Sequence, residues 1–285
     1  MSGKICIVTG ANSGIGKETA LGLAQMGARV VMVCRNAEKG KAALEDIRRE
    51  SGSSQVDLLI ADMSSQASVR ALAEQIQRKY PRLDVLVNNA GGAAPAVALS
   101  ADGIEMTLAT NHLGPALLTL LLLDLLKASA PSRIINVSSC EAQRPARLDM
   151  NDLQFERRRY GSIAAYRQSK LLMNTFTFEL ARRLAGTGVT ANCLHPGAVA
   201  TNIWSANPLP LIVKLIIAVV KPFMLSSKQG AAVSLYLATS PEVAQVSGEY
   251  FVNSKPAKSN PLSRDPKLMA EVRLWTEKMT GLPLA

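Results

Sequence analysis

The sequence predicts an α/β fold: a doubly wound, mostly parallel sheet with helices on both faces, in a single domain. Three observations lead to this prediction. Short apolar runs alternate with helical patterns of about 10–15 residues along the chain. The first apolar run leads directly into a glycine-rich turn, TGANSGIG (9–16). No linker, internal repeat or low-complexity tract divides the 285 residues, so we expect one domain, 1–285.

The expected strands are short and apolar. Parallel strands covered on both faces are nearly continuous apolar runs, because both sides of the sheet are buried. Segments of this kind lie at 4–10, 28–35, 56–62, 83–91, 133–139, 189–197 and 248–254.

Helical patterns connect these strands, and the first of them ends at Gly27. The expected helices cover 16–27, 37–51, 66–80, roughly 103–128, the segment containing Tyr166, 228–240 and roughly 265–280. Alternation of this kind produces repeated βαβ units.

The composition indicates a globular protein with an aliphatic core. Apolar residues make up 48% of the chain, charged residues 19% and aromatic residues 4%. The cysteines are widely separated and form no CxxC pair: Cys6, Cys34, Cys140 and Cys193. This pattern favours reduced thiols in the cytoplasm over a disulfide framework, and we expect no metal site.

The net charge of +10 does not indicate a nucleic-acid partner. Apart from Arg157, Arg158 and Arg159, the basic residues are scattered, and no recognition-helix or zinc-finger pattern accompanies them. An anionic cofactor, an acidic membrane surface or simple solubility explains the charge.

No transmembrane helix is expected, and no signal peptide precedes the first strand. Two apolar runs, 113–126 and 208–225, are interrupted by Asp124 and by Lys214 and Lys221, respectively. Neither reaches the roughly 20 uninterrupted apolar residues that a spanning helix needs.

The first turn predicts a phosphate-binding site. Gly10, Gly14 and Gly16 follow a strand and open a helix, so the backbone can approach a phosphate that the helix N-terminus attracts. The spacing differs from GxGxxG, and a plain strand–helix turn is the alternative.

The end of the second strand favours NADP(H) over NAD(H). Arg35 stands where an acidic residue would bind the ribose 2′-hydroxyl, and an arginine can instead bind a 2′-phosphate. Lys17 would add a second positive charge, whereas a solvated loop arginine is the alternative reading of Arg35. Asp62 is placed to accept a bond from the adenine amino group.

Six motifs in order carry a resemblance to a known family: TGANSGIG (9–16), NNAG (88–91), NHLG (111–114), NVSS (136–139), YRQSK (166–170) and HPG (195–197). Over its whole length the chain resembles the short-chain dehydrogenase/reductase family, most closely its retinol-dehydrogenase-like branch. The resemblance implies a Rossmann-like fold, and a homodimer or tetramer.

The resemblance also implies a catalytic tetrad of Asn111, Ser139, Tyr166 and Lys170. Tyr166 would exchange a proton with the carbonyl oxygen, and Ser139 would hydrogen-bond the same oxygen. Free tyrosine titrates near pH 10, so Lys170 and a nicotinamide cation would have to lower the pKa of Tyr166.

Cofactor contacts are expected along the carboxyl edge of the sheet. They are Gly10, Asn12, Ser13, Gly14, Ile15, Gly16, Arg35, Asp62, Met63, Asn89, Ala90, Gly91, Tyr166, Lys170, Pro196, Gly197, Val199 and Thr201.

Pro115 lies four residues after Asn111 and has no amide to bond the Asn111 carbonyl. We therefore expect a kink and a released carbonyl, which in the family holds a water connected to the lysine. His112 and His195 are interpreted as structural, and Tyr160 as loop packing.

The segment after HPG is almost wholly apolar. We expect 202–228 to cover a hydrophobic substrate, with a peripheral membrane contact through 204–225 or a core or subunit contact as alternatives. The leucine-rich run 116–126 is expected in the core and, as in the family, against a partner in a dimer.

The function predicted is an NADP(H)-dependent oxidoreductase acting on a hydrophobic small molecule, namely a retinal-like aldehyde, ketone or alcohol. A reductase of a steroid or polar carbonyl metabolite is one alternative. A non-catalytic NADP(H)-binding regulatory protein is another, although a pure binder would not need Tyr166.

Overall fold

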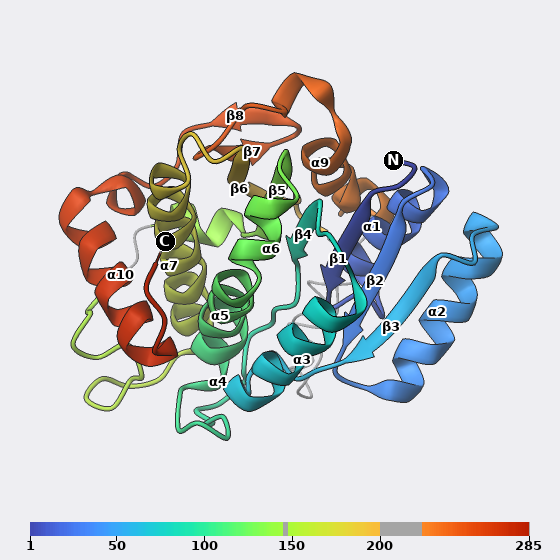
Figure 1. The fold of residues 1–285 in the computed structure, drawn as a ribbon. Coiled ribbons are helices and arrows are strands. Elements are labelled where there is room, and N and C mark those ends of the chain that lie inside the picture. The colour runs from blue at the N-terminus through green and yellow to red at the C-terminus, as the bar shows by residue number, and fades with distance from the viewer. Residues whose placement is uncertain (145–147, 200–223, 285) are drawn as a thin grey trace.

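The computed structural model describes residues 1–144, 148–199 and 224–284, which form an α/β fold around one sheet (Figure 1). The strands are β1 (Ile5–Thr9), β2 (Arg29–Cys34), β3 (Val56–Ile60), β4 (Val85–Asn88), β5 (Ser132–Val137), β6 (Val189–His195), β7 (Tyr250–Val252) and β8 (Lys255–Ala257). Their order is β3-β2-β1-β4-β5-β6-β7-β8. Every neighbouring pair from β3 to β7 is parallel, and β7 and β8 are antiparallel. The predicted fold class is confirmed.

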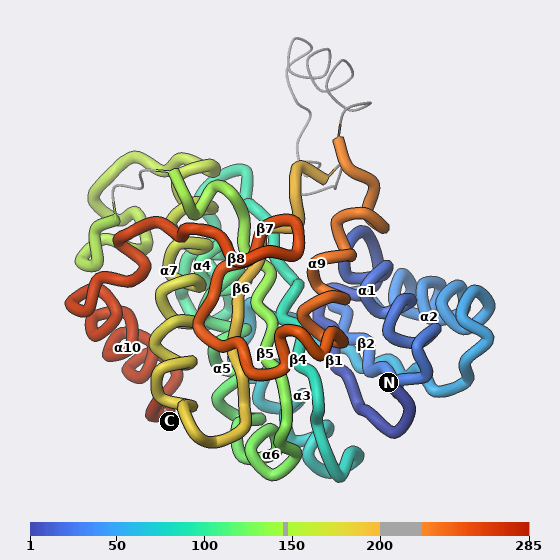
Figure 2. Tube along the Cα trace, turned by 90° about the horizontal axis from the view of Figure 1, so that it is seen from above, coloured from blue at the N-terminus to red at the C-terminus, as the bar shows by residue number. Residues whose placement is uncertain are grey.

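Helices cover both faces of this sheet. They are α1 (Gly14–Gln25), α2 (Ala37–Ser51), α3 (Gln66–Lys79), α4 (Met106–Leu108), α5 (Gly114–Leu121), α6 (Leu123–Ala128), α7 (Ser162–Arg183), α9 (Ser227–Thr239) and α10 (Pro266–Thr280). Side chains alternate along β1, so Cys6 and Val8 pack under α1, α2 and α9, whereas Ile5 and Ile7 face α3 and α7. Helices α1 and α9 lie side by side, as do α7 and α10 (Figures 1 and 2).

The region 103–128 is helical for most of its length but is not one continuous helix, so the prediction of a single helix there is wrong. A π-helical turn, η1 (Ala109–Leu113), separates α4 from α5, and the amide of Gly114 bonds the carbonyl of Ala109. A Cβ atom on Gly114 would lie 1.9 Å from the Met63 carbonyl oxygen, so the chain passes unusually close to its neighbour here. The helix is therefore interrupted immediately before Pro115, where a kink was predicted.

The short antiparallel strand β8 was not predicted. Asn253 and Ser254 link it to β7 and have φ angles of 50° and 59°, the left-handed pair that a two-residue type I′ hairpin requires. In the register of this hairpin, Val252 pairs with Lys255 and Phe251 with Pro256. Because the residues flanking such a loop form the hydrogen-bonded pair, the nitrogen of Pro256 faces the free edge of the sheet.

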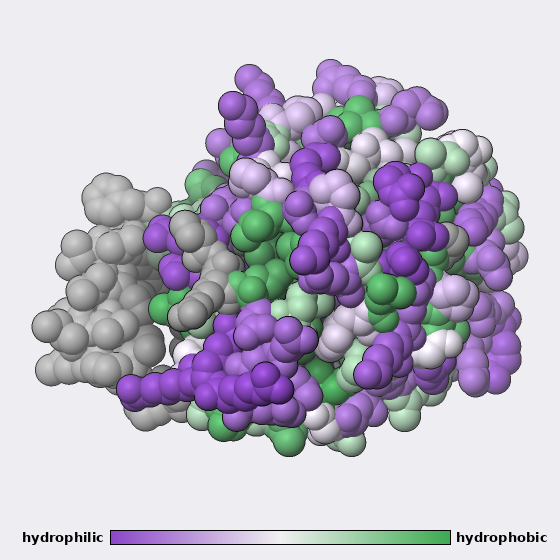
Figure 3. Space-filling model, turned by 90° about the vertical axis from the view of Figure 1, so that its left-hand side faces the viewer, coloured by the Kyte–Doolittle hydropathy of each residue, from purple (hydrophilic) through white to green (hydrophobic). Residues whose placement is uncertain are grey.

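The C-terminal helix α10 packs against α7 and the π turn. Asp265 caps it by accepting a bond of 2.8 Å from the amide of Leu268, and Gly281 ends it with a φ angle of 70°. The side of the molecule where α10 lies is largely hydrophilic, with smaller apolar areas (Figure 3).

The leucine-rich run 116–126 contributes to the core of a single chain, as predicted. Leu117, Leu118, Leu122 and Leu126 are fully buried there. Among the described helices, none is both long and apolar enough to span a bilayer. Most of the segment 202–228, with its predicted covering role, lies outside the described residues, as does most of 204–225.

Candidate active site

One cavity of about 790 Å³ opens at the carboxyl ends of the central strands. It is lined by nearly all the residues predicted from the sequence: Gly10, Asn12, Ser13, Gly14, Ile15, Gly16, Arg35, Asp62, Met63, Asn89, Ala90, Gly91, Ser139, Tyr166, Lys170, Pro196, Gly197 and Val199. Asn111 lies behind this lining, and Thr201 lies outside the described residues. Parallel α/β sheets bind ligands at this edge.

The glycine turn brings β1, β4 and the start of α1 close together. A Cβ atom on Gly16 would lie 2.3 Å from the Gly10 carbonyl oxygen and 2.4 Å from Asn89 Nδ2, so only glycine fits. Asn89 Nδ2 donates to the Thr9 carbonyl at 2.8 Å and fixes this approach. Ser13, which precedes α1, makes no side-chain capping bond. The first amides of α1 therefore have no side-chain cap and suit a phosphate.

Arg35 is available to an anionic ligand at the rim of the cavity. Its side chain is 73% exposed, and Nη1 lies 4.0 Å from Asp62 Oδ2, at the limit of an ion pair. The other oxygen of Asp62 accepts bonds from the amide and hydroxyl of Ser64, at 2.9 and 2.7 Å.

Lys17 does not supply the second positive charge that was predicted. Its Nζ lies 2.6 Å from Asp46 Oδ2 on α2, and it does not line the cavity. The carboxylate of Asp46 engages this lysine and lies 29 positions away along the chain, beyond the reach of a local pattern.

Ser139, Tyr166 and Lys170 meet in the cavity. Tyr166 shares a hydrogen bond with the Ser139 side chain, and Lys170 Nζ lies 5.7 Å from the centre of the Tyr166 ring. The Lys170 side chain is buried among these segments, and its Nζ donates to the carbonyl of Val137 at 2.7 Å. Tyrosine and lysine are thus held on one face of α7, one turn apart.

Burial controls the titration of both groups. It raises the pKa of Tyr166 to about 12, while the Ser139 bond acts in the opposite direction. Burial also lowers the pKa of Lys170 to about 8. Desolvation of the phenolate is the largest effect here, and the lowering of the Tyr166 pKa by Lys170 together with a nicotinamide cation stays a prediction.

Asn111 organises the site from behind. Its Nδ2 donates to the Gly92 carbonyl at 2.8 Å and to Ser169 Oγ at 2.9 Å, while Oδ1 accepts from the Gly92 amide at 2.9 Å. Ser169 Oγ in turn donates to the Tyr166 carbonyl at 2.8 Å. Asn111 therefore ties the loop after β4 to α7, and the release of its main-chain carbonyl stays a prediction.

The outer wall of the cavity was not foreseen. It consists mostly of small apolar side chains from the loop after β4 and from α4: Ala93, Ala94, Pro95, Ala96, Val97, Ala98 and Met106. Tyr160 holds this loop, because its hydroxyl lies within donating distance of both the Ala94 carbonyl oxygen, at 3.0 Å, and Glu105 Oε1, at 3.2 Å. The signal was the run GAAPAVA (92–98) directly after the NNAG motif.

His195, which was predicted only to precede a turn, also lines the cavity. Its Nδ1 accepts a bond of 3.1 Å from the amide of Cys140, which fixes the ring beside the Ser139 segment. Burial lowers the pKa of His195. A neutral ring is thus favoured here, with the proton on Nε2.

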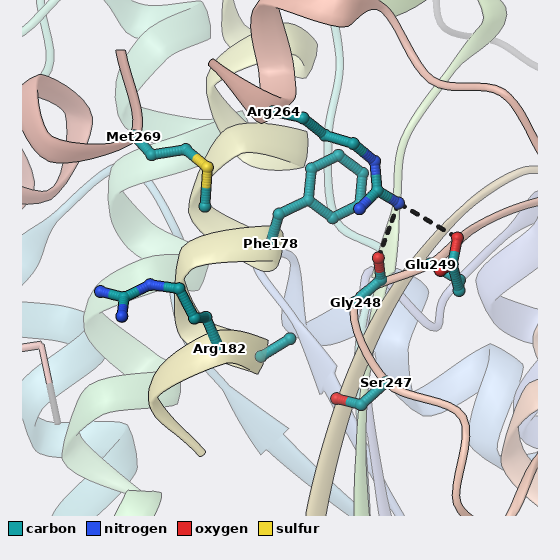
Figure 4. Close-up of a pocket in the computed structure, with 8 residues that line it drawn as sticks. Phe178, Arg182, Ser247, Gly248, Glu249, Arg264 and Met269 are labelled. Atoms are coloured by element: carbon teal, nitrogen blue, oxygen red, sulfur yellow. Dashed lines mark hydrogen bonds and ion pairs between the residues drawn. The ribbon is translucent and has the colours of Figure 1, made fainter. Parts of the chain in front are cut away.

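A second pocket, of about 340 Å³, lies beside α7 and the start of β7 (Figure 4). Arg264 lies over the Phe178 ring at 4.1 Å and donates to Gly248 and Glu249 (Figure 4). Phe178 packs against buried Tyr250, whose hydroxyl donates to the Ser139 carbonyl at 3.4 Å. This region supports the backbone of Ser139 from behind.

Comparison with known proteins shows the family to which the chain belongs. The family model for short chain dehydrogenases matches residues 4–151. Human retinol dehydrogenase 13 is 43% identical over 98% of this chain and 85% of its own. The chain belongs to the short-chain dehydrogenase/reductase family. It is therefore an oxidoreductase of alcohol and carbonyl groups, as predicted.

Solved structures share this fold over most or all of the chain. An uncharacterised protein from Mycobacterium paratuberculosis matches with a TM-score of 0.80 at 32% identity, covering 100% of this chain and 96% of that one. A complex of Pseudomonas aeruginosa RhlG with NADP matches with a TM-score of 0.70 at 28% identity, over 88% of this chain and 94% of that one. This likeness of fold supports a nicotinamide cofactor for this chain.

Proposed function

We propose that this dehydrogenase/reductase uses NADP(H) and acts on a hydrophobic aldehyde or ketone, or the corresponding alcohol, of retinal-like character. The observation that carries the proposal is the meeting of Ser139, Tyr166 and Lys170 in a cavity with a small-residue apolar wall. The similarity to human retinol dehydrogenase 13 supports the substrate class.

The cofactor assignment depends on the glycine turn and on Arg35. The uncapped start of α1 and the close approach at Gly16 suit a pyrophosphate. Arg35, exposed at the rim beside Asp62, would bind a 2′-phosphate, and the RhlG relative is an NADP complex. The bound nicotinamide would supply or accept the hydride.

Proton transfer falls to Tyr166. In reduction, the carbonyl oxygen would sit against the Tyr166 hydroxyl and Ser139 Oγ, which already share a hydrogen bond. Tyr166 would donate its proton as negative charge grows on that oxygen, and Ser139 would stabilise the charge. Lys170, with a pKa of about 8, would hold positive charge beside the phenol over most of the neutral range.

The apolar wall supports the proposal of a hydrophobic substrate. The side chains of residues 93–98 in this wall carry only methyl groups and a proline ring, and none of them can form a hydrogen bond. Bulky apolar carbonyl compounds would bury their surface against this wall, whereas a polar substrate would lose hydrogen bonds to water there.

The test is turnover of a panel of retinoid, long-chain, aromatic, steroid and polar carbonyl compounds, followed by NADPH consumption. We expect Tyr166→Phe to lower kcat by about 10²–10⁴-fold while nucleotide binding is preserved. Tyr236→Phe is the matched control, because it removes a phenol that bonds Glu242 on the exposed surface. Turnover that survives in Tyr166→Phe would refute the acid–base role. A wild type that binds NADPH but reduces nothing would favour a regulatory binder.

A further inference from the structure

The turn that follows Ser139 is joined to α7 by an ion pair. This turn, η2 (Cys140–Gln143), contains Glu141, whose Oε2 is in ion-pair contact with Nε of Arg167. The two side chains are 20% and 30% exposed, so the pair is shielded from much of the solvent. Arg144 binds the other oxygen of Glu141 at 3.2 Å. The carboxylate is thus held between two guanidinium groups.

The positions of both partners are significant. Arg167 directly follows Tyr166 on α7, and Glu141 lies two residues after Ser139. The amide of Glu141 donates to Ser139 Oγ at 3.2 Å. A shift of the turn would therefore move the hydroxyl that shares a hydrogen bond with Tyr166.

Other contacts hold the same turn from the opposite side. His195 on β6 accepts from the amide of Cys140, and Tyr250 on β7 donates to the carbonyl of Ser139. Asn260 donates to the carbonyl of Ala142 at 3.3 Å. These contacts fix the turn to the sheet and to the C-terminal region, whereas the ion pair fixes it to the helix that carries Tyr166.

The pair also controls charge near the phenol. Glu141 and Cys140, both on the turn, raise the pKa of Tyr166. On α7, Lys170 lies beneath the ring and Arg167 faces Glu141. Arg144, after the turn, binds the same carboxylate, and His195 on β6 lines the same cavity with a lowered pKa.

We propose that Arg167 and Glu141 form a positioning pair, which sets the separation of Ser139 and Tyr166 and keeps a carboxylate beside the phenol neutralised. This inference rests on the proposed acid–base role of Tyr166. Neither residue is expected to touch substrate. Their effect is exerted through the two groups that bind the carbonyl oxygen.

The first experiment measures kcat against pH in the direction of alcohol oxidation, where the rate rises as Tyr166 loses its proton. Arg167→Gln leaves Glu141 without its α7 partner. We expect kcat to fall between about 10- and 10²-fold, because a displaced reacting group is costly. We also expect the apparent pKa of the profile to rise by about one unit.

Variants separate charge from simple packing. Arg167→Lys keeps the charge, so its profile should stay near that of the wild type. Adding Glu141→Gln to Arg167→Gln removes the carboxylate that only Arg144 still pairs, so the apparent pKa of the profile should return to the wild-type value. Arg182→Gln is the matched control, because it breaks an ion pair with Glu179 on the same helix, at 2.8 Å, far from Tyr166. It should leave the profile unchanged.

A fall in kcat without a shift of the profile would overturn the proposal in favour of a merely structural role. Equal behaviour of Arg167→Gln and Arg182→Gln would overturn it as well. If the wild type turns over no substrate, the proposed function fails, and urea unfolding then tests the pair without substrate. Effects of Arg167→Gln and Glu141→Gln that simply add in the double variant would show that the two residues do not interact.

Discussion

His112 lies at the contact between the π turn and α10, and it is fully buried. Its ring lies between Phe176 and Trp275, with centroid distances of 5.9 and 5.8 Å. Nε2 bonds the Thr276 hydroxyl at 3.2 Å, while Nδ1 has no hydrogen-bond partner among the described residues. Burial lowers the pKa of His112 to about 3. The native state therefore keeps this ring neutral well into the acid range.

This pKa makes the stability of the protein depend on pH. In the unfolded chain histidine titrates near pH 6.5. Between about pH 6.5 and 3, His112 therefore binds a proton in the unfolded state but not in the native state. The free energy of unfolding therefore falls as pH falls through this window. At about pH 5 the loss due to His112 is about 2 kcal/mol relative to neutral pH.

Urea unfolding of the wild type and of His112→Phe, at about pH 7 and about pH 5, measures this loss. At neutral pH the variant loses the hydrogen bond to Thr276, which destabilises it. It also loses the buried, unpaired Nδ1, which offsets part of that cost. Towards pH 5 the wild type should lose about 2 kcal/mol more than the variant. The difference cancels contributions that both proteins share, including those of carboxylates and His195. Parallel stability curves for the two proteins between these pH values would refute the reasoning.

Three further predictions concern the nucleotide site and the helix break. Arg35→Asp should weaken NADPH binding by about 10–100-fold and shift preference towards NADH, and equal wild-type affinities for both nucleotides would contradict the cofactor assignment. Gly16→Ala should weaken binding of either nucleotide, because its Cβ would lie 2.3 Å from the Gly10 carbonyl oxygen, and unchanged binding by titration would show that the turn can yield. Pro115→Ala should alter the pH–rate profile by restoring an amide that can bond the Asn111 carbonyl; an unchanged profile and an unchanged structure would exclude this role.

Features set by local chemistry could be predicted from the sequence. The apolar runs form the strands because both faces of this parallel sheet are buried. The glycines form the turn because Gly16 has no room for a side chain. Arg35 lines the cavity, as predicted, because it directly follows β2 at the edge where ligands bind. The pairing of Tyr166 with Lys170 followed from helical spacing.

Features set by distant neighbours could not be predicted. Whether Pro115 produces a kink or a π turn depends on how closely Gly114 approaches the Met63 carbonyl. Lys17 was assigned to the nucleotide because its partner Asp46 is remote in sequence. Strand β8 (Lys255–Ala257) could not be predicted because it is short and contains a proline.

The β7–β8 hairpin has a consequence for how copies of this protein behave when they meet. An unpaired strand edge invites pairing with another chain, and proline and lysine are means of discouraging it. Pro256 offers no amide at the free edge, and Lys255 adds charge beside it. At the opposite edge, β3 carries Asp57 bound to Arg29 and Lys79. Both margins of the sheet thus carry charge or proline of the kind that discourages strand exchange and edge-to-edge aggregation.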